Sequence, residues 1–227
     1  MGWIVLVGLL VAGGGSATAQ DGLYAPVRPD ETALVRVVHL NSDDQSARVT
    51  IDVGNTSYAD VHAQDGTAYR PVRPGVFVVL AYGHREALTA TTGTFYTAVV
   101  SPDGITILSD TYHDDPLRAQ LVLYNLTSAP LRLDAVVPEA TLLEAVAPGA
   151  SGTRVINAIP VTLAVKGTTG ADSAGNAASG GTAAGTDRFE IALQLERGAS
   201  YGIMVQRKPG GLAGLVLKAA VQGDGVE

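Results

Sequence analysis

The sequence predicts an all-β protein built from two tandem antiparallel β-sandwich domains. Its apolar runs are short and rich in Val, Ile and Leu, turns that contain Gly or Pro separate them, and helical periodicity is nearly absent. Strands that recur at this spacing with such turns are typical of antiparallel sandwiches and not of alternating strand–helix units.

A first series of predicted strands occupies the N-terminal half of the chain. Its runs are VRVVHL (35–40), RVTIDV (48–53), VFVVLAY (76–82), FYTAVV (95–100) and ITIL (105–108). The tetrapeptide SPDG (101–104) joins the last two runs. Proline presets φ and glycine accepts a positive φ, so this tetrapeptide predicts a hairpin turn.

A second series follows in the C-terminal half. Its runs are LVLYNL (121–126), LRLDAVV (131–137), VTLAVK (161–166), FEIALQL (189–195), YGIMVQ (201–206) and LVLKAAV (215–221). ATLLEAVA (140–147) is expected to form one or two helical turns. Residues 167–187 are rich in Gly, Ala, Ser and Thr, which bury too little surface to become ordered. A low-complexity loop is therefore expected there.

The two series resemble each other, which predicts an internal duplication. Residues 35–42 align with 121–128 at an offset of 86, and residues 93–100 align with 198–205 at an offset of 105. The 167–187 loop accounts for this difference in offset. The alternative is that any two β-sandwiches share this much similarity. We predict an N-terminal sandwich over 20–110, a linker over 111–116 and a C-terminal sandwich over 117–227.

Residues 1–19 are predicted to be a signal peptide. The apolar run 3–12 has the length of an h-region, and small residues up to Ala19 fit a cleavage site before Gln20. The alternative is an uncleaved membrane anchor, because the n-region lacks Lys and Arg. An exported chain without cysteine must depend on its apolar core, since it has no disulfides.

The net charge of the chain limits the kinds of partner that it can attract. The chain carries 15 Lys and Arg against 22 Asp and Glu, a formal charge of −7. This argues against nucleic acid and against a general attraction to anionic polymers, although a local basic pocket stays open.

The sequence shows no complete catalytic or metal-binding motif. Asp110 and His113 have the D-x-x-H spacing of SGNH-type esterases, but the Gly-Asp-Ser block of the nucleophile is missing, and a solvated linker is the favoured interpretation. His39 ends a strand and is expected to face solvent or cap a turn. The four histidines lie far apart, so no metal or other cofactor is predicted.

A carbohydrate-binding platform would need exposed aromatic rings. The single tryptophan, Trp3, leaves with the signal peptide. Tyr82, Tyr96 and Tyr201 stand in apolar strands and are expected in the core or at its rim.

Four segments resemble one known family, in the same order along the chain. These are DGLYAP (21–26) followed by VRV (35–37), LVLYNLTS (121–128), RVINAIPV (154–161) and the late strand at 198–205. They are similar to the AlgF family of periplasmic alginate O-acetylation proteins. The chain departs from the family pattern at His39, where an Asn is expected, at Ala158, which replaces a proline, and at the 167–187 loop.

The resemblance implies a non-catalytic periplasmic accessory of a Gram-negative bacterium, required for O-acetylation of alginate or a similar exopolysaccharide. It implies a membrane-bound O-acyltransferase and periplasmic SGNH-type acetyltransferases as partners that the accessory bridges. Leu23, Tyr24 and Pro26 are candidate partner-binding residues, because an exposed apolar extended segment can dock on a partner. Their alternative role is packing onto the first sandwich.

Two other functions stay open. A carbohydrate-binding module would hold the polysaccharide near the enzymes. An acetyl-carrying transferase subunit would bear the acetyl group on Ser or His.

Overall fold

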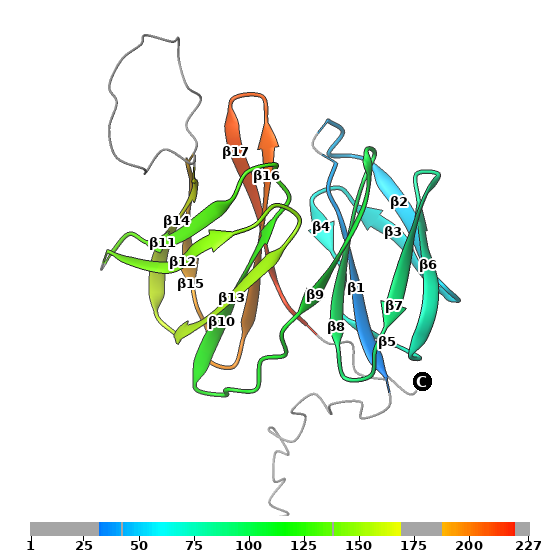
Figure 1. The fold of residues 1–227 in the computed structure, drawn as a ribbon, viewed down its shortest axis with the longest axis horizontal. Coiled ribbons are helices and arrows are strands. Elements are labelled where there is room, and N and C mark those ends of the chain that lie inside the picture. The colour runs from blue at the N-terminus through cyan, green and yellow to red at the C-terminus, as the bar shows by residue number, and fades with distance from the viewer. Residues whose placement is uncertain (1–31, 42, 138, 169–187, 221–227) are drawn as a thin grey trace, which may run out of the picture.

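The computed structural model describes residues 32–41, 43–137, 139–168 and 188–220. Within these ranges the chain forms seventeen strands in four sheets and no helix, which confirms the all-β prediction. Accordingly, no helix there is long and apolar enough to span a bilayer. The four sheets make two sandwiches that lie side by side (Figure 1).

The first sandwich lies on the right in Figure 1. Its inner sheet has the order β4–β1–β8–β9, with β5 also paired to β1, and its outer sheet has the order β3–β2–β6–β7. The strands are β1 (Ala33–His39), β2 (Arg48–Val53), β3 (Thr56–His62), β4 (Asp65–Gly66), β5 (Arg70–Val72), β6 (Gly75–Ala81), β7 (His84–Ala90), β8 (Phe95–Ser101) and β9 (Gly104–Asp110).

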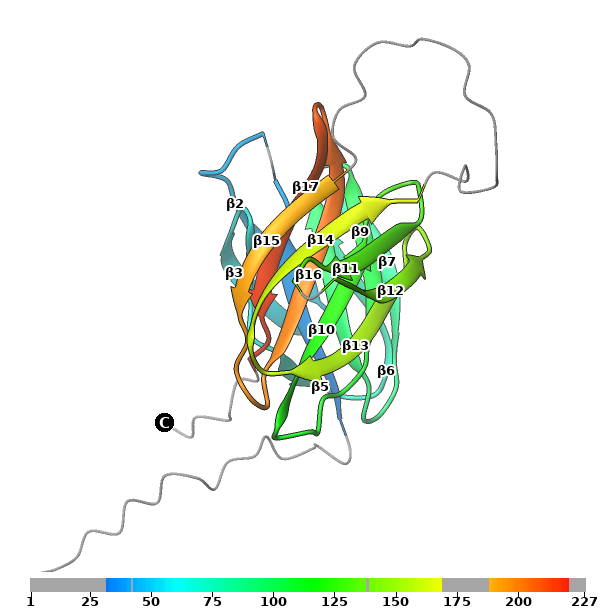
Figure 2. The ribbon, with the colours of Figure 1, turned by 90° about the vertical axis from the view of Figure 1, so that its left-hand side faces the viewer.

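The second sandwich repeats this strand order, with β13 in the place of β4 and β5. Its inner sheet is β13–β10–β16–β17 and its outer sheet is β12–β11–β14–β15. The strands are β10 (Arg118–Asn125), β11 (Leu131–Ala135), β12 (Ala140–Val146), β13 (Ser151–Asn157), β14 (Pro160–Gly167), β15 (Arg188–Gln194), β16 (Ser200–Lys208) and β17 (Gly211–Lys218). Figure 2 looks onto its outer sheet, with the first sandwich behind it.

The registers agree with an internal duplication. Each inner sheet contains one parallel pair, β1 with β8 and β10 with β16, whereas the other pairs are antiparallel. Val35 lies opposite Tyr96, and Leu121 lies opposite Tyr201. These positions are the ones that the offsets of 86 and 105 align.

Both sandwiches also contain the same tyrosine contact, near the start of β8 in the first and near the start of β16 in the second. The Tyr96 hydroxyl accepts a hydrogen bond from the backbone N–H of Thr91 at 3.1 Å, and the Tyr201 hydroxyl accepts one from Glu196 at 3.0 Å. Both tyrosines are buried, as the sequence predicts. Each ring packs in its own sandwich core while its hydroxyl fixes the preceding loop.

The two inner sheets pack against each other, so the molecule has four layers. Along β1, Val35 and Val37 belong to the core of the first sandwich, whereas Val38 belongs to a separate cluster that both sandwiches share. This interface cluster consists of Val38, Leu40, Val99 and Leu108 from the first sandwich, and Val122, Tyr124 and Met204 from the second. The central strands are therefore buried on both faces, which explains their continuous apolar runs.

The structure corrects one element of the predicted secondary structure. ATLLEAVA (140–147) is not helical: residues Ala140–Val146 form strand β12, which pairs with β11. Leu142 and Leu143 pack against the second core and Val146 is buried in it. Burial of these apolar side chains in the second core outweighs the helix propensity of Ala, Leu and Glu.

Strand β9 ends at Asp110 and β10 begins at Arg118, so the connection between the sandwiches is short. Strands β14 and β15 pair along their whole length, from Pro160 opposite Gln194 to Lys166 opposite Arg188. The connection between them falls in residues 169–187, which lie outside the described residues.

Candidate functional site

A buried polar cluster joins the two sandwiches within their apolar interface. Arg36 donates hydrogen bonds to Thr97 Oγ1 at 2.8 Å and to the Tyr124 hydroxyl at 2.9 Å. The carboxylate of Asp110 accepts hydrogen bonds of 2.5 Å from Tyr69, Thr97 and Tyr124. These residues come from β1, β8, β9, β10 and the segment before β5, so the cluster fixes both inner sheets at once.

The electrostatics of this cluster favour a fixed charge state. Burial opposes the charge of Arg36, but Tyr69, Tyr124 and Asp110 outweigh it and raise the pKa of the guanidinium. Burial also raises the pKa of Tyr124 and that of Tyr69 well above ordinary values. The two phenols therefore stay protonated and donate hydrogen bonds to the partly buried carboxylate of Asp110.

The D-x-x-H pair is not a catalytic dyad in this structure, and Asp110 is not a solvated linker residue. Its carboxylate oxygens bond to Tyr69, Thr97 and Tyr124, whereas His113 Nε2 contacts the backbone carbonyl of Arg118 at 2.9 Å. The sequence could not show this, because the three donors come from distant segments.

Two hollows lie along the junction of the sandwiches. The first has a volume of about 140 Å³ and is lined by Tyr69, Phe95, Asp110, Tyr112, Val122 and Tyr124 among others. The second has a volume of about 480 Å³ and a more polar lining, which includes Ser101, Asp103, Thr106, Thr127, Gln206 and Arg207. The second falls in the size range of small-ligand sites.

The outer sheet of the first sandwich exposes an apolar stripe on β6. Val76, Val78 and Leu80 alternate along the strand with Phe77 and Val79, which pack into the core. Val76 is 74% exposed and Val78 is 40% exposed. Ala87 lies opposite Val78 on β7, so no charged side chain stands directly across from that residue. We call Val76, Val78 and Leu80 the apolar stripe.

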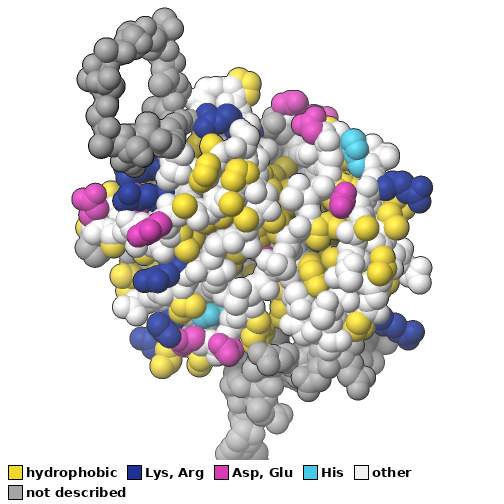
Figure 3. Space-filling view, in the orientation of Figure 1, with side chains coloured by type: hydrophobic (Ala, Val, Ile, Leu, Met, Phe, Trp, Pro, Cys, Tyr) yellow, Lys and Arg dark blue, Asp and Glu magenta, His cyan; other side chains and the backbone are white. Residues whose placement is uncertain are grey.

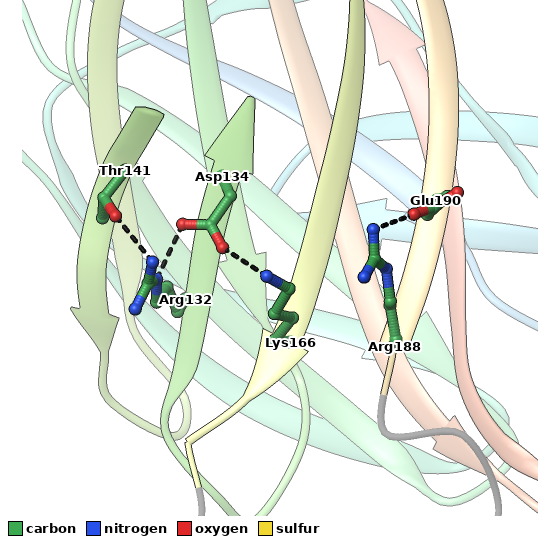
Figure 4. Close-up of polar contacts among 6 residues, drawn as sticks. All are labelled: Arg132, Asp134, Thr141, Lys166, Arg188 and Glu190. Atoms are coloured by element: carbon green, nitrogen blue, oxygen red, sulfur yellow. Dashed lines mark hydrogen bonds and ion pairs between the residues drawn. The ribbon is translucent and has the colours of Figure 1, made fainter. Parts of the chain in front are cut away.

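The outer sheet of the second sandwich carries a charged ladder instead (Figure 4). Asp134 on β11 binds Arg132 Nε at 2.7 Å and Lys166 Nζ at 2.8 Å. Arg132 also donates to Thr141 Oγ1 at 2.8 Å, and Arg188 pairs with Glu190 on β15. We call these residues the charged ladder.

The charge of the two sandwiches differs in sign. Residues 32–110 hold five Arg against eight Asp and Glu, a formal charge of −3, whereas residues 111–168 and 188–220 hold nine Lys and Arg against seven Asp and Glu, a formal charge of +2. Figure 3 shows Lys and Arg side chains gathered over the second sandwich, on the left. The duplicated halves have therefore diverged in surface chemistry.

His39 is buried, contrary to the expectation that it would face solvent. Its Nδ1 lies 2.9 Å from the carbonyl oxygen of Val61, and its Nε2 lies 2.6 Å from the hydroxyl of Tyr82. Tyr82 is 38% exposed and follows β6 in the turn to β7. The strand pattern gave no sign of this contact, because the two residues are far apart in the sequence.

The other predicted site residues were Leu23, Tyr24 and Pro26 for partner binding and Ala19 and Gln20 for signal cleavage. All five lie outside the described residues. Within the described part of the chain, no three His, Cys, Asp or Glu side chains converge as a metal site would require.

Comparison with known proteins gives a family match. The family model described as "Alginate O-acetyl transferase AlgF" matches residues 6–175, more than half of the chain. The chain is also similar to the alginate biosynthesis protein AlgF of Pseudomonas aeruginosa, at 24% identity over 152 residues, which cover 66% of this chain and 68% of that protein.

Two solved structures show a weaker likeness. The C-terminal domain of AlgF from Pseudomonas aeruginosa matches at 21% identity and a TM-score of 0.31, over 45% of this chain and 98% of that one. A family CBM26 carbohydrate-binding module from Eubacterium rectale, crystallised with maltoheptaose, matches at 8% identity and a TM-score of 0.28, over 84% of this chain and 98% of that one. With TM-scores this low, neither likeness bears on function.

Proposed function

This chain belongs to the AlgF family, and from that premise we propose that it is a non-catalytic periplasmic accessory of polysaccharide O-acetylation that bridges the acetyltransferase components. Family membership supports a role in alginate O-acetylation. The bridging role is our own inference, and it is supported by the arrangement of the two outer sheets.

The observation that carries the bridging role is the pair of dissimilar outer faces. The inner sheets pack on each other through the interface cluster and the Arg36–Asp110 polar cluster, so the two outer sheets lie at opposite ends of a four-layer stack. One outer sheet carries the apolar stripe and the other the charged ladder. A rigid body with two different faces can hold two partners at a fixed separation.

The partners that we propose are a membrane-bound O-acyltransferase and periplasmic SGNH-type acetyltransferases. The apolar stripe fits an interface whose centre excludes water, because burial of exposed Val and Leu on association is favourable. The charged ladder fits a partner with a complementary pattern of charges, which gives specificity more than affinity.

Binding of the purified chain to each partner tests this proposal. We expect Val76→Asp with Val78→Asp to abolish binding to one partner and leave the other unchanged. The double exchange Arg188→Glu with Glu190→Arg keeps an ion pair and reverses its polarity, so it should weaken binding to the second partner alone. Leu117→Asp is the matched control, because Leu117 is 68% exposed and lies in the connection before β10, which belongs to neither outer sheet.

If both outer-face variants bind both partners as the unmodified chain does, the bridging proposal is wrong. If one variant loses both partners while its fold is intact, the two binding sites lie on a single face, which also contradicts a bridge with opposite ends.

Carbohydrate binding is a second candidate, and the polar hollow of about 480 Å³ between the sandwiches favours it. Hydroxyl and amide groups such as those of Ser101, Thr106 and Gln206 can hydrogen-bond to sugar hydroxyls. Titration of the chain with alginate oligosaccharides would show saturable binding that Gln206→Ala weakens. If the chain does not bind the oligosaccharides, or if Gln206→Ala binds them as tightly as the unmodified chain, this candidate is removed.

A further inference from the structure

His39 and Tyr82 form a hydrogen-bonded pair with a defined proton arrangement. His39 Nδ1 lies 2.9 Å from the Val61 carbonyl oxygen, which can only accept, so Nδ1 carries a proton. In the neutral ring Nε2 then has a free lone pair, and it accepts the hydroxyl proton of Tyr82 across 2.6 Å. The hydroxyl is thus in contact with a base that a third group orients.

The backbone at Tyr82 is unusual for an aromatic residue. Tyr82 has a φ of 52° and Gly83 a φ of 78°, and these two residues form the whole connection between β6 and β7. A two-residue hairpin turn with positive φ at both positions normally has Asn, Asp or Gly first, because a bulky side chain is disfavoured there. A tyrosine in this place is better explained by its contact with His39 than by the turn.

The second sandwich shows what this position needs for folding alone. Asn125 is the counterpart of His39 at the offset of 86, and its Nδ2 donates to the Val146 carbonyl at 2.8 Å. Val146 on β12 pairs with Leu131, as Val61 on β3 pairs with Val49, so the two acceptors are equivalent. For folding, one side-chain donor to that carbonyl is therefore sufficient.

The remaining polar atoms of Asn125 serve the local turn. Nδ2 also donates to Ala129, and Oδ1 accepts from the N–H and hydroxyl of Thr127. In the first sandwich the remaining nitrogen of His39 instead contacts a partly exposed phenol. The contact between His39 and Tyr82 is thus additional to the structural role that His39 shares with Asn125.

We propose that Tyr82 is an acyl acceptor and that His39 is its general base, so that the first sandwich can carry an acetyl group as an aryl ester. The donor is an activated acetyl ester or thioester. This adds a covalent step to the accessory role. The choice of an acetyl group rests on the proposed function, whereas the acceptor and the base rest on the geometry.

The transfer balances without any redox partner. Tyr82 Oη attacks the carbonyl carbon of the acetyl group while His39 Nε2 takes the phenolic proton. The bond from that carbon to the oxygen or sulfur of the donor breaks, and the departing alcohol or thiol collects the proton from Nε2. The products are O-acetyl-Tyr82 and the free alcohol or thiol.

The chemistry of tyrosine suits a transient carrier. A phenolate leaves more readily than a sugar alkoxide, so an aryl acetate keeps enough transfer potential to acetylate a sugar hydroxyl. The exposures fit as well, because Tyr82 is 38% exposed and His39 is fully buried. The acceptor thus belongs to a partly exposed side chain, while the base that contacts it is shielded from water.

The first experiment treats the purified chain with p-nitrophenyl acetate and maps the acetylated residue by mass spectrometry. We expect one acetyl group on Tyr82 and none in Tyr82→Phe. His39→Asn reproduces the residue of the second sandwich and keeps a donor for the Val61 carbonyl, so it should fold. It should acetylate Tyr82 on the order of 100-fold more slowly, the usual contribution of a general base.

Tyr112→Phe is the matched control, because Tyr112 is a partly exposed tyrosine that packs on Phe95 at the start of β8, whereas His39 pairs with Val100 near the end of that strand, so the change should not alter the labelling. Labelling of Tyr82 at the same rate in His39→Asn as in the unmodified chain would overturn the proposal. So would a label spread evenly over lysines and several tyrosines. Neither result touches the bridging role, which is measured by partner binding.

Discussion

Among the residues that the structure describes, two charged side chains are buried, and their charges are compensated in different ways. Arg36 lies in the junction of the sandwiches, where Thr97 and Tyr124 accept its hydrogen bonds and Asp110 balances its charge. Asp134 lies on the outer sheet of the second sandwich, between the partly exposed Arg132 and Lys166. The first arrangement fixes the domains relative to each other, whereas the second shapes a surface.

The Asp134 carboxylate should make stability depend on pH. Burial alone would raise its pKa, but hydrogen bonds from Lys166 and Arg132 hold the pKa below its ordinary value. A lowered folded-state pKa stabilises the protein above the unfolded-state value of about 4, and this contribution disappears as the pH falls through the folded-state pKa. We expect Asp134→Asn to cost about 1 kcal/mol at neutral pH, because both cations are partly exposed.

Urea unfolding of the unmodified chain and Asp134→Asn at pH 7, 5 and 3 measures this contribution. The difference in unfolding free energy should be largest at neutral pH and approach zero at the lowest pH. Glu144→Gln on the neighbouring strand β12 is the control, since its side chain is exposed. A difference that grows on acidification would contradict the assigned direction of the pKa shift.

At the scale of single elements, the central strands were predictable, as were the edge strands β9, β15 and β17, whereas other edge strands were not. The central runs of β1, β8, β10 and β16 are apolar on both faces and stand out in the sequence. Strands β3, β7 and β13 are polar along much of their length because one face or one edge is exposed. Strand β12 was mistaken for a helix because its pairing with β11 is interrupted by two register shifts, which disturb the alternation.

The candidate sites depended on contacts that a sequence alone does not reveal. The duplication was predictable, because two blocks recur in the same order, the 167–187 loop accounts for the difference in their offsets, and the structure pairs the same positions. The His39–Tyr82 contact was not predictable, although the Tyr82-Gly83 pair between two strand runs was a signal for a two-residue turn. The polar cluster of Arg36 and Asp110 combines five segments, and only their packing brings those side chains together.

Gly202 on β16 shows how closely the inner sheets approach each other. A Cβ at this position would lie 2.9 Å from Tyr124 Cε2 and 3.0 Å from Arg36 Nη2. We expect Gly202→Ala to lower the unfolding free energy by roughly 1–3 kcal/mol, because overpacking forces neighbours from their preferred positions. In a Tyr124→Leu background the ring is gone, so the same substitution should cost less. Equal costs in the two backgrounds, measured by urea unfolding, would show that the clash does not determine the loss.

At the scale of the whole molecule, the insertion between β14 and β15 should be dispensable for folding. Lys166 and Arg188 form the last pair of this hairpin, so its ladder is complete without the intervening residues. Deleting residues 170–184 leaves a short connection, and loop-closure entropy changes slowly with loop length. We expect the melting temperature to change by only a few degrees. A large fall in melting temperature would mean that the deleted residues contribute to a core.

The four-layer arrangement predicts that the two sandwiches unfold together. Met204 is buried in the interface cluster and belongs to neither sandwich core. Met204→Lys places an unpaired charge between the inner sheets and should separate the sandwiches while each core stays intact. Calorimetry should then show two transitions where the unmodified chain shows one. The neighbouring Ile203 faces the second core, so Ile203→Lys should instead remove amide protection from the second sandwich alone. Two transitions already in the unmodified chain would mean that the interface does not couple the two halves, and the bridging proposal would lose the rigid body on which it depends.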